Sequence, residues 1–150
     1  MTEANTPEKG AVAAADTRNG LEQIEALAAG LYPASAMTTL MPFETLPPEK
    51  GRVQFRAEPD ERFLNGMHIV HGGWVMTMLD NAMGLAAHST VEAGEYCPSH
   101  ETSVKFGQAL KPDCGPLTVT AEVISRGGLM ITVESRMETA AGDLVAHGSS

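Results

Sequence analysis

Hydrophobic and polar residues follow two different periods along the chain. Between residues 71 and 89, apolar residues recur at three- and four-residue steps, at Val75, Met78, Leu79, Ala82, Leu85 and Ala86. This spacing predicts one long buried helix. After a loop with Gly94 and Pro98, apolar and polar residues alternate in 101–111, 117–126, 129–139 and 141–150. This second period predicts a meander of three or four antiparallel strands, with Gly127 and Gly128 as a two-residue hairpin turn.

The N-terminal half has weaker patterns. Apolar residues at helical spacing begin after Gly20 and stop before Gly30 and Pro33, which predicts a short amphipathic helix. Segments 36–46 and 51–58 contain β-branched and aromatic residues and are predicted as two strands joined by a turn. The resulting order of helices and strands is an α+β plan, an antiparallel sheet wrapped on one helix.

Composition sets the domain organisation. With 150 residues and a hydrophobic content of 43%, the chain is sufficient for one core without metals or disulfides. Residues 1–19 are polar and Ala-rich without apolar periodicity, so we predict a disordered arm there and one domain over 20–150. No further domain is expected.

The cysteines and the apolar segments indicate the compartment. Cys97 and Cys114 match neither a zinc ligand spacing nor a redox pair, so reduced thiols in a cytoplasmic protein are expected, with no metal and no cofactor. Thr77, Asp80 and Asn81 interrupt the most apolar segment. The sequence therefore predicts no membrane span.

The net charge of −9 excludes one class of partner. Nucleic-acid binding needs clustered Lys and Arg to neutralise phosphates, so no nucleic-acid partner is expected. An anionic ligand would also be repelled at long range and would need a local basic patch. Candidates for such a patch are Lys105, Lys111, Arg126 and Arg136.

Asp80 is the residue that the helical pattern does not explain. It lies in the middle of the predicted helix, between Met76 and Met83, where an unpaired carboxylate is unusual. The helix opens with His71, Gly72 and Gly73, and backbone N–H groups at a helix N-terminus stabilise a developing oxyanion. The position of Asp80 therefore requires an explanation other than packing.

The same residues carry a resemblance to a known family. Residues 63–87 (FLNGMHIVHGGWVMTMLDNAMGLAA) and 103–112 (SVKFGQALKP) resemble the hotdog-fold acyl-CoA thioesterases of the PaaI and 4-hydroxybenzoyl-CoA type. Asn65 lies six residues before His71, and Asp80 lies nine after it, a spacing similar to that family's. The resemblance runs from about Gly51 to the C-terminus.

The resemblance implies a function and an assembly. It implies an antiparallel sheet around one central helix, a homodimer joined sheet to sheet, often paired into a tetramer, and hydrolysis of an aryl or medium-chain acyl-CoA to free acid and CoA. Gly72 would polarise the thioester carbonyl through its N–H group. Asp80 would act as nucleophile or general base, and Asn65 would orient substrate or water.

Four further residues are implied as substrate contacts. His71, Gly73 and Trp74 lie beside the helix opening. Ser103 occupies a place where related sequences carry Ser or Thr that holds the attacking water, although Thr102 would serve equally with a one-residue shift.

The rise of an α-helix adds a constraint. Eight residues separate Gly72 from Asp80, which is roughly 12 Å along one helix. One chain cannot bring both to one carbonyl, so we predict an active site between two protomers. Two alternatives stay open: a hotdog hydratase or dehydratase, in which His71 or His68 faces Asp80, and a non-catalytic acyl-CoA binding module.

Overall fold

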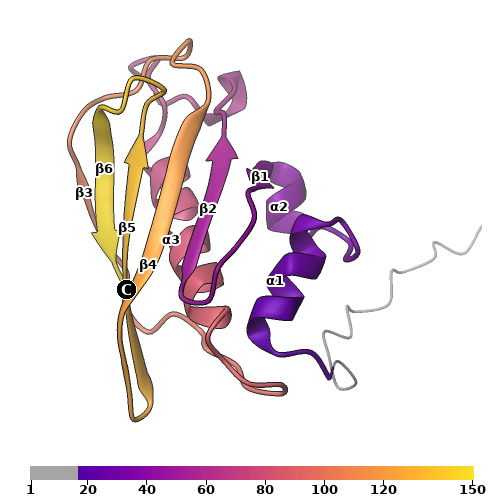
Figure 1. The fold of residues 1–150 in the computed structure, drawn as a ribbon. Helices are drawn as coiled ribbons and strands as arrows, with labels where there is room; N and C mark the ends of the chain where they lie inside the picture. Colours follow the sequence, from indigo (N-terminus) through magenta and orange to yellow (C-terminus); the bar gives the residue numbers. More distant parts are fainter. Residues whose placement is uncertain (1–16) are drawn as a thin grey trace, which may run out of the picture.

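One curved antiparallel sheet surrounds a long helix in the computed structural model, which describes residues 17–150 (Figure 1). The helices are α1 (Gly20–Ala28), α2 (Ala36–Leu40) and α3 (Gly72–His88), with a 3-10 turn at Glu61–Phe63. The strands are β1 (Phe43–Thr45), β2 (Arg52–Ala57), β3 (Ser103–Phe106), β4 (Leu117–Gly127), β5 (Met130–Glu138) and β6 (Leu144–Ser149).

The predicted N-terminal arm, residues 1–19, lies largely outside the described residues. Asn19 belongs to the folded part, because its side chain accepts from the Glu22 amide while Glu22 bonds back to the Asn19 amide, 3.1 and 2.8 Å apart. This capping box starts α1 at Gly20. The helix ends before Gly30, whose φ of +70° suits glycine, as the sequence predicts.

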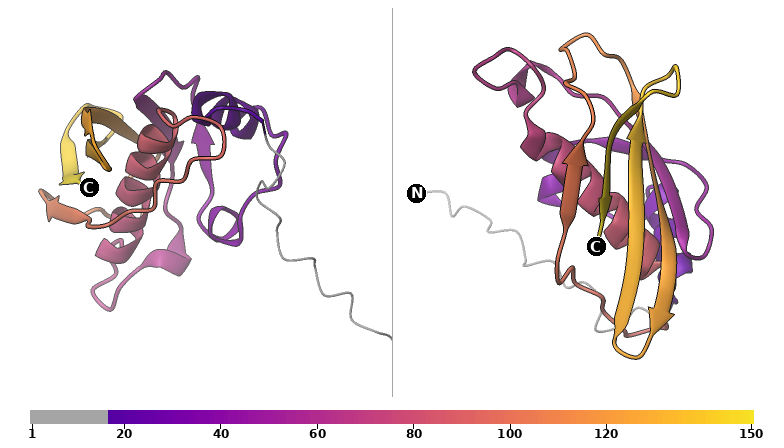
Figure 2. Two further views of the ribbon diagram at one scale, coloured as in Figure 1. Left: turned by 90° about the horizontal axis from the view of Figure 1, so that it is seen from below. Right: turned by 90° about the vertical axis from the view of Figure 1, so that its left-hand side faces the viewer.

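Strand order differs from a simple meander. The sheet runs β1-β2-β4-β5-β6-β3, so β1 pairs with β2, and β4, β5 and β6 form consecutive hairpins. The strand after the long helix, β3, lies at the far edge beside β6, with Val104 opposite Gly148. Alternation along the chain identifies strands, but it does not specify their neighbours. Figure 2 shows the sheet curving around α3.

The segment 36–46 is partly helical, which corrects the expected strand. The Ser35 hydroxyl accepts from the Thr38 amide at 3.0 Å and caps α2, leaving three residues for β1. This local cap outweighs the β-preference of Thr38 and Thr39. The β4–β5 turn is also shifted by one residue, because Gly127 pairs with Met130 and the turn is Gly128–Leu129.

The core lies between α3 and the concave face of the sheet. Met78, Leu79 and Ala82 of α3 are fully buried against side chains such as Phe55 and Val119. α1 packs across the C-terminal end of α3, where the Gly20 amide donates to the Val91 carbonyl at 2.9 Å. In the described part of the chain, no helix is long and apolar enough to cross a bilayer.

Candidate active site

The N-terminus of α3 presents one free backbone donor. The His71 side chain caps the helix, and its Nδ1 accepts from the Gly73 amide at 2.8 Å. The Trp74 amide donates to the His71 carbonyl at 2.9 Å. Within residues 17–150, the Gly72 N–H has no backbone or side-chain acceptor. Of the two candidate glycines, Gly72 therefore keeps its amide available to a ligand, whereas the Gly73 amide is occupied.

The Phe106 ring of β3 lies beside Gly72. A Cβ placed on Gly72 would come within 3.2 Å of the Phe106 ring, tighter than an ordinary contact. A side chain at position 72 would therefore displace this ring, which is itself 54% exposed. Glycine keeps both the close approach of β3 and the access to the amide.

Asn65 shapes the loop before the helix. Its Oδ1 accepts from the Met67 amide at 2.8 Å and from the Ile69 amide at 3.4 Å. The turn places His68 at a φ of +57° and returns the chain to Val70. The carboxamide oxygen of Asn65 is thus used inside the loop, and its amide NH2 is the group that could contact a substrate or a water.

Asp80 is half-buried in the middle of α3 and is held by two hydroxyl groups. Thr102 Oγ1 donates to Asp80 Oδ1 at 2.8 Å, and Ser99 Oγ donates to the same oxygen at 3.2 Å. No Lys or Arg of the described chain forms an ion pair with this carboxylate. Oδ1 is thereby fixed in place, while Oδ2 has no hydrogen-bond donor among the described residues.

The structure separates the two hydroxyl candidates. Val104 and Phe106 of β3 point toward α3, and Ser103 alternates with them, so its side chain lies on the outer face of the sheet. Thr102 rather than Ser103 reaches Asp80. Ser99 was missed from the sequence, because only the path of the loop between α3 and β3 brings it there.

Trp74 lies in the core rather than at a pocket wall. It is 2% exposed and packs beside Phe63, with ring centroids 6.4 Å apart. Within one chain its indole has no surface to offer a substrate. The sequence placed it correctly next to the helix opening, but side chains on successive helical residues point in different directions.

Gly72 and Asp80 lie on the same uninterrupted helix. Eight residues at about 1.5 Å per residue place them roughly 12 Å apart along its axis. The histidines of the hydratase alternative, His68 and His71, lie at or before the start of α3, and His71 Nδ1 is engaged by Gly73. His71 is thus about two and a half helical turns from Asp80 of its own chain, and His68 lies in the loop before the helix.

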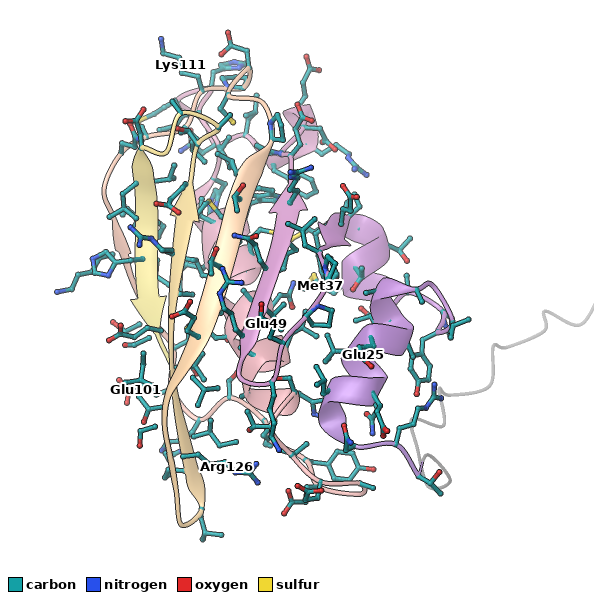
Figure 3. All side chains as sticks on the ribbon, in the orientation of Figure 1. Glu25, Met37, Glu49, Glu101, Lys111 and Arg126 are labelled. Carbon is teal, nitrogen blue, oxygen red and sulfur yellow. The ribbon has the colours of Figure 1, made fainter. Side chains whose placement is uncertain are left out.

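The four candidate cations do not form one patch. Arg126 bonds to the Thr90 carbonyl and pairs with Glu95 at 3.2 Å, and Arg136 pairs with Glu138 at 3.2 Å. Lys111 and Arg126 lie at opposite ends of the molecule (Figure 3). Lys111 follows Leu110, whose carbonyl accepts from the Val70 amide at 3.0 Å, so this lysine lies near the start of α3.

Comparison with known proteins agrees with this geometry. Residues 67–146 match the thioesterase superfamily. A candidate esterase of Saccharolobus solfataricus is 31% identical over 98 residues, which cover 65% of this chain and 68% of the relative.

Solved structures share the fold. The PaaI protein of Escherichia coli, from the phenylacetic acid degradation operon, superposes with a TM-score of 0.74 at 19% identity, covering 87% of this chain and 89% of that one. A hypothetical thioesterase protein of Streptococcus pneumoniae, crystallised with coenzyme A, gives a TM-score of 0.66 at 22% identity. The match covers 71% of this chain and 83% of that one.

The antiparallel sheet around one long central helix defines a hotdog protein. The chain belongs to the thioesterase superfamily. The expected fold and the expected enzyme class are thereby confirmed.

Proposed function

We propose that this protein hydrolyses an acyl-CoA thioester to the free acid and CoA, with Asp80 as the reacting carboxylate and the Gly72 amide as the carbonyl's hydrogen-bond donor. The observation that carries the proposal is the pair of groups left without partners inside the described chain, the Gly72 N–H and Asp80 Oδ2. A similar fold crystallised with coenzyme A supports the choice of ligand.

The reaction follows from these two groups. The thioester carbonyl oxygen accepts from the Gly72 N–H, whose helix-terminal position favours negative charge as the tetrahedral intermediate forms. Asp80 takes a proton from an attacking water, or attacks the carbonyl carbon itself to form a mixed anhydride that water then cleaves. The C–S bond breaks, and the sulfur leaves as the CoA thiolate. It takes up the proton that Asp80 holds in the general-base route, or a proton of the water that cleaves the anhydride in the nucleophilic route.

These two routes differ in the fate of an oxygen atom. During turnover in heavy-oxygen water, a nucleophilic Asp80 acquires the label when water attacks the mixed anhydride at the Asp80 carbonyl, so a labelled Asp80 identifies the covalent route. As general base it would remain unlabelled and the label would enter only the product acid. Mass spectrometry of the peptide containing Asp80 distinguishes the two.

The site is proposed to form between two protomers. Because one helix holds Gly72 and Asp80 roughly 12 Å apart, the Gly72 amide and the Asp80 that serve one substrate come from different chains. The edge strand β3, which follows Thr102 and ends at the exposed Phe106, is the edge proposed to join two sheets. A homodimer, which can pair further into a tetramer, is therefore part of the proposal.

Gly72→Pro is suited to test the amide. Proline is favoured at the first helical position, and His71 already has the extended conformation that a following proline requires, with φ −65° and ψ 133°. The change removes the N–H and leaves the helix intact. Gly72→Ala is the matched control, because it adds the same Cβ against Phe106 but keeps the amide.

The deciding experiment mixes two inactive variants. Asp80→Asn and Gly72→Pro should each lose thiol release from acyl-CoA, by on the order of 100-fold or more. After co-refolding in equal amounts, half of the dimers are mixed and contain one intact site, so about a quarter of the wild-type activity should return. No recovery would exclude a shared site.

Two controls separate this proposal from its alternatives. Asp143→Asn alters an exposed loop carboxylate and should keep full activity. Crotonyl-CoA should release CoA without forming a hydroxyacyl-CoA, since a hydratase would form the latter. If wild-type protein released no thiol from any acyl-CoA, the hydrolase proposal would fail and a binding module would remain.

A further inference from the structure

A cavity of about 690 Å³ lies beside the second half of α3. Its walls come from α3, from the loop that leads to β3, and from the β4–β5 hairpin; they include Met83, Gly84, Cys97, Ser99, Ile131 and Val133. Ser99 both lines this cavity and donates to Asp80. Asp80 is not itself a wall of the cavity, and Ser99 is the residue that connects the two.

The α3 wall of the cavity consists of Met83, Gly84 and Ala87, and Gly84 belongs to one row of residues along the helix. Asp80, Gly84 and His88 are spaced four residues apart and lie on one face of the helix. The loop runs alongside this row, because Ser99 contacts Asp80 and Cys97 Sγ lies 3.8 Å from His88 Nδ1. Asp80 thus marks one end of the row and the Cys97–His88 pair marks the other, about 12 Å away along the helix.

Gly84 leaves the middle of this row open. Glycine inside a helix is less stable than alanine by roughly 0.5–1 kcal/mol. A Cβ at position 84 would meet no atom within 4 Å, so packing inside the described chain does not require glycine. The missing side chain instead leaves space for something that lies along the helix.

The lining suits an uncharged occupant. Met83, Ala87, Ile131 and Val133 supply apolar surface along the cavity. Its charged residues are Glu95 and Arg126, which pair with each other at 3.2 Å, and Glu101, which leaves one net negative charge. Figure 3 shows Glu101 and Arg126 toward the same end of the molecule, away from Lys111. Carboxylates at this end disfavour the phosphates of CoA and leave the apolar acyl group as the part that fits.

We propose that this cavity binds the acyl chain of the substrate, that it takes straight medium-length chains, and that Gly84 determines the length accepted. The inference rests on the proposed hydrolysis at Asp80 and adds the substrate class. An extended chain attached at the reacting carbonyl passes over Gly84 and ends at Cys97. Each buried methylene should raise kcat/KM roughly fourfold until the cavity is filled.

The first test fills the space at residue 84. Wild-type protein should prefer octanoyl- and decanoyl-CoA over butyryl-CoA by at least about tenfold. Gly84→Leu should lose about tenfold or more on decanoyl-CoA while changing butyryl-CoA less than about threefold. Gly127→Leu is the matched control, since its Cβ also meets nothing within 4 Å and it does not line the cavity.

The second test does not depend on turnover. Burial raises the pKa of both the Cys97 and the Cys114 thiols, so both should alkylate slowly, and only Cys97 lines the cavity. Decyl-CoA, a thioether that cannot be hydrolysed, should protect Cys97 from iodoacetamide and leave Cys114 unprotected. Ethyl-CoA should protect neither thiol.

The outcomes separate the two proposals. Equal rates on butyryl- and decanoyl-CoA, or alkylation of Cys97 that decyl-CoA does not slow, would overturn the acyl cavity while hydrolysis at Asp80 stands. Protection of Cys97 without any thiol release would leave the cavity and overturn the hydrolysis. If Gly84→Leu instead dissociated the protein in sedimentation and lost activity equally on all chain lengths, position 84 would face a second copy and the inference would be wrong.

Discussion

The Thr102 hydroxyl donates to Asp80 Oδ1 at 2.8 Å, across 22 residues of sequence. Thr102 directly precedes β3, and Asp80 lies in the middle of α3. This bond ties the orientation of the carboxylate to the edge strand of the sheet. The orientation of the Asp80 carboxylate therefore depends on the position of β3 in the sheet. β3 is also the strand proposed to join two protomers.

Thr102→Val should lower thioesterase activity more than Ser103→Ala. A hydrogen bond to a charged group contributes about 1.5–3 kcal/mol, so removing the Thr102 hydroxyl should reduce kcat roughly 10- to 100-fold. Ser103 lies on the outer face of the sheet, and its change should leave kcat within about twofold. Thiol-release kinetics of both purified variants test this.

Thr102→Ser is the control, because it restores the hydroxyl without the methyl group and should recover most of the activity. Equal loss in Thr102→Val and Ser103→Ala would contradict the assignment. A loss of folding rather than of chemistry would appear as a shifted denaturation midpoint in Thr102→Val.

His71→Ala should destabilise the protein without removing the proposed oxyanion donor. The His71 imidazole is the acceptor for the Gly73 amide, and loss of an N-cap side chain costs about 1 kcal/mol. His71→Ser should keep most of that stability, because serine caps helices well. Urea denaturation of the three proteins measures the difference. If a substitution of His71 left stability unchanged but abolished activity, His71 would have a direct catalytic role.

Lys111→Ala should weaken the use of CoA esters at low salt. The lysine lies near the start of α3, where the thioester carbonyl is proposed to bind, and a single exposed charge contributes about 1 kcal/mol or less. KM for acyl-CoA should therefore rise up to about fivefold, and the difference should shrink as salt is added.

The matched controls for Lys111 use a different substrate and a different lysine. An acyl-N-acetylcysteamine thioester has no phosphates, so its hydrolysis should not respond to Lys111→Ala. Lys50→Ala removes an exposed charge from the turn before β2 and should alter the hydrolysis of neither thioester. An equal effect of Lys111→Ala on both thioesters would mean that this residue acts on the fold rather than on CoA.

Periodic segments could be predicted from the sequence, and long-range neighbours could not. The helix carrying Gly72 and Asp80 and the alternating strands follow from local spacing, because each period fixes which residues share a face. The position of β3 beside β6 depends on which sheet edge is free, so Thr102, Ser103 and Ser99 could not be distinguished. α2 was missed because a single serine cap outweighed the β-branched residues after it.

Stability should fall on mild acidification because of His88. Burial lowers the pKa of His88 below its usual 6.5, so the neutral imidazole is favoured in the folded state. The unfolded chain takes up this proton first as the pH falls below about 6.5, so the free energy of unfolding decreases from there until the folded state is also protonated. Above that pH the contribution is fully present.

The neutral form also fits the hydrogen bonds around the ring. Gln23 Nε2 donates to the Arg18 carbonyl at 2.9 Å, which turns Gln23 Oε1 toward His88 Nε2, also at 2.9 Å. His88 Nε2 is then the donor, and Nδ1 is left to accept from the Cys97 thiol. A second proton on Nδ1 would remove that acceptor.

His88→Gln should therefore flatten the stability profile between about pH 7 and 5. One proton accounts for at most about 1.4 kcal/mol per pH unit, and the half-exposed ring should give less. Urea denaturation at several pH values measures the slope of the free energy of unfolding against pH. The control is His147→Gln, which replaces an exposed histidine of β6 and should leave that slope unchanged. A slope that persists in His88→Gln would assign the acid sensitivity to other groups.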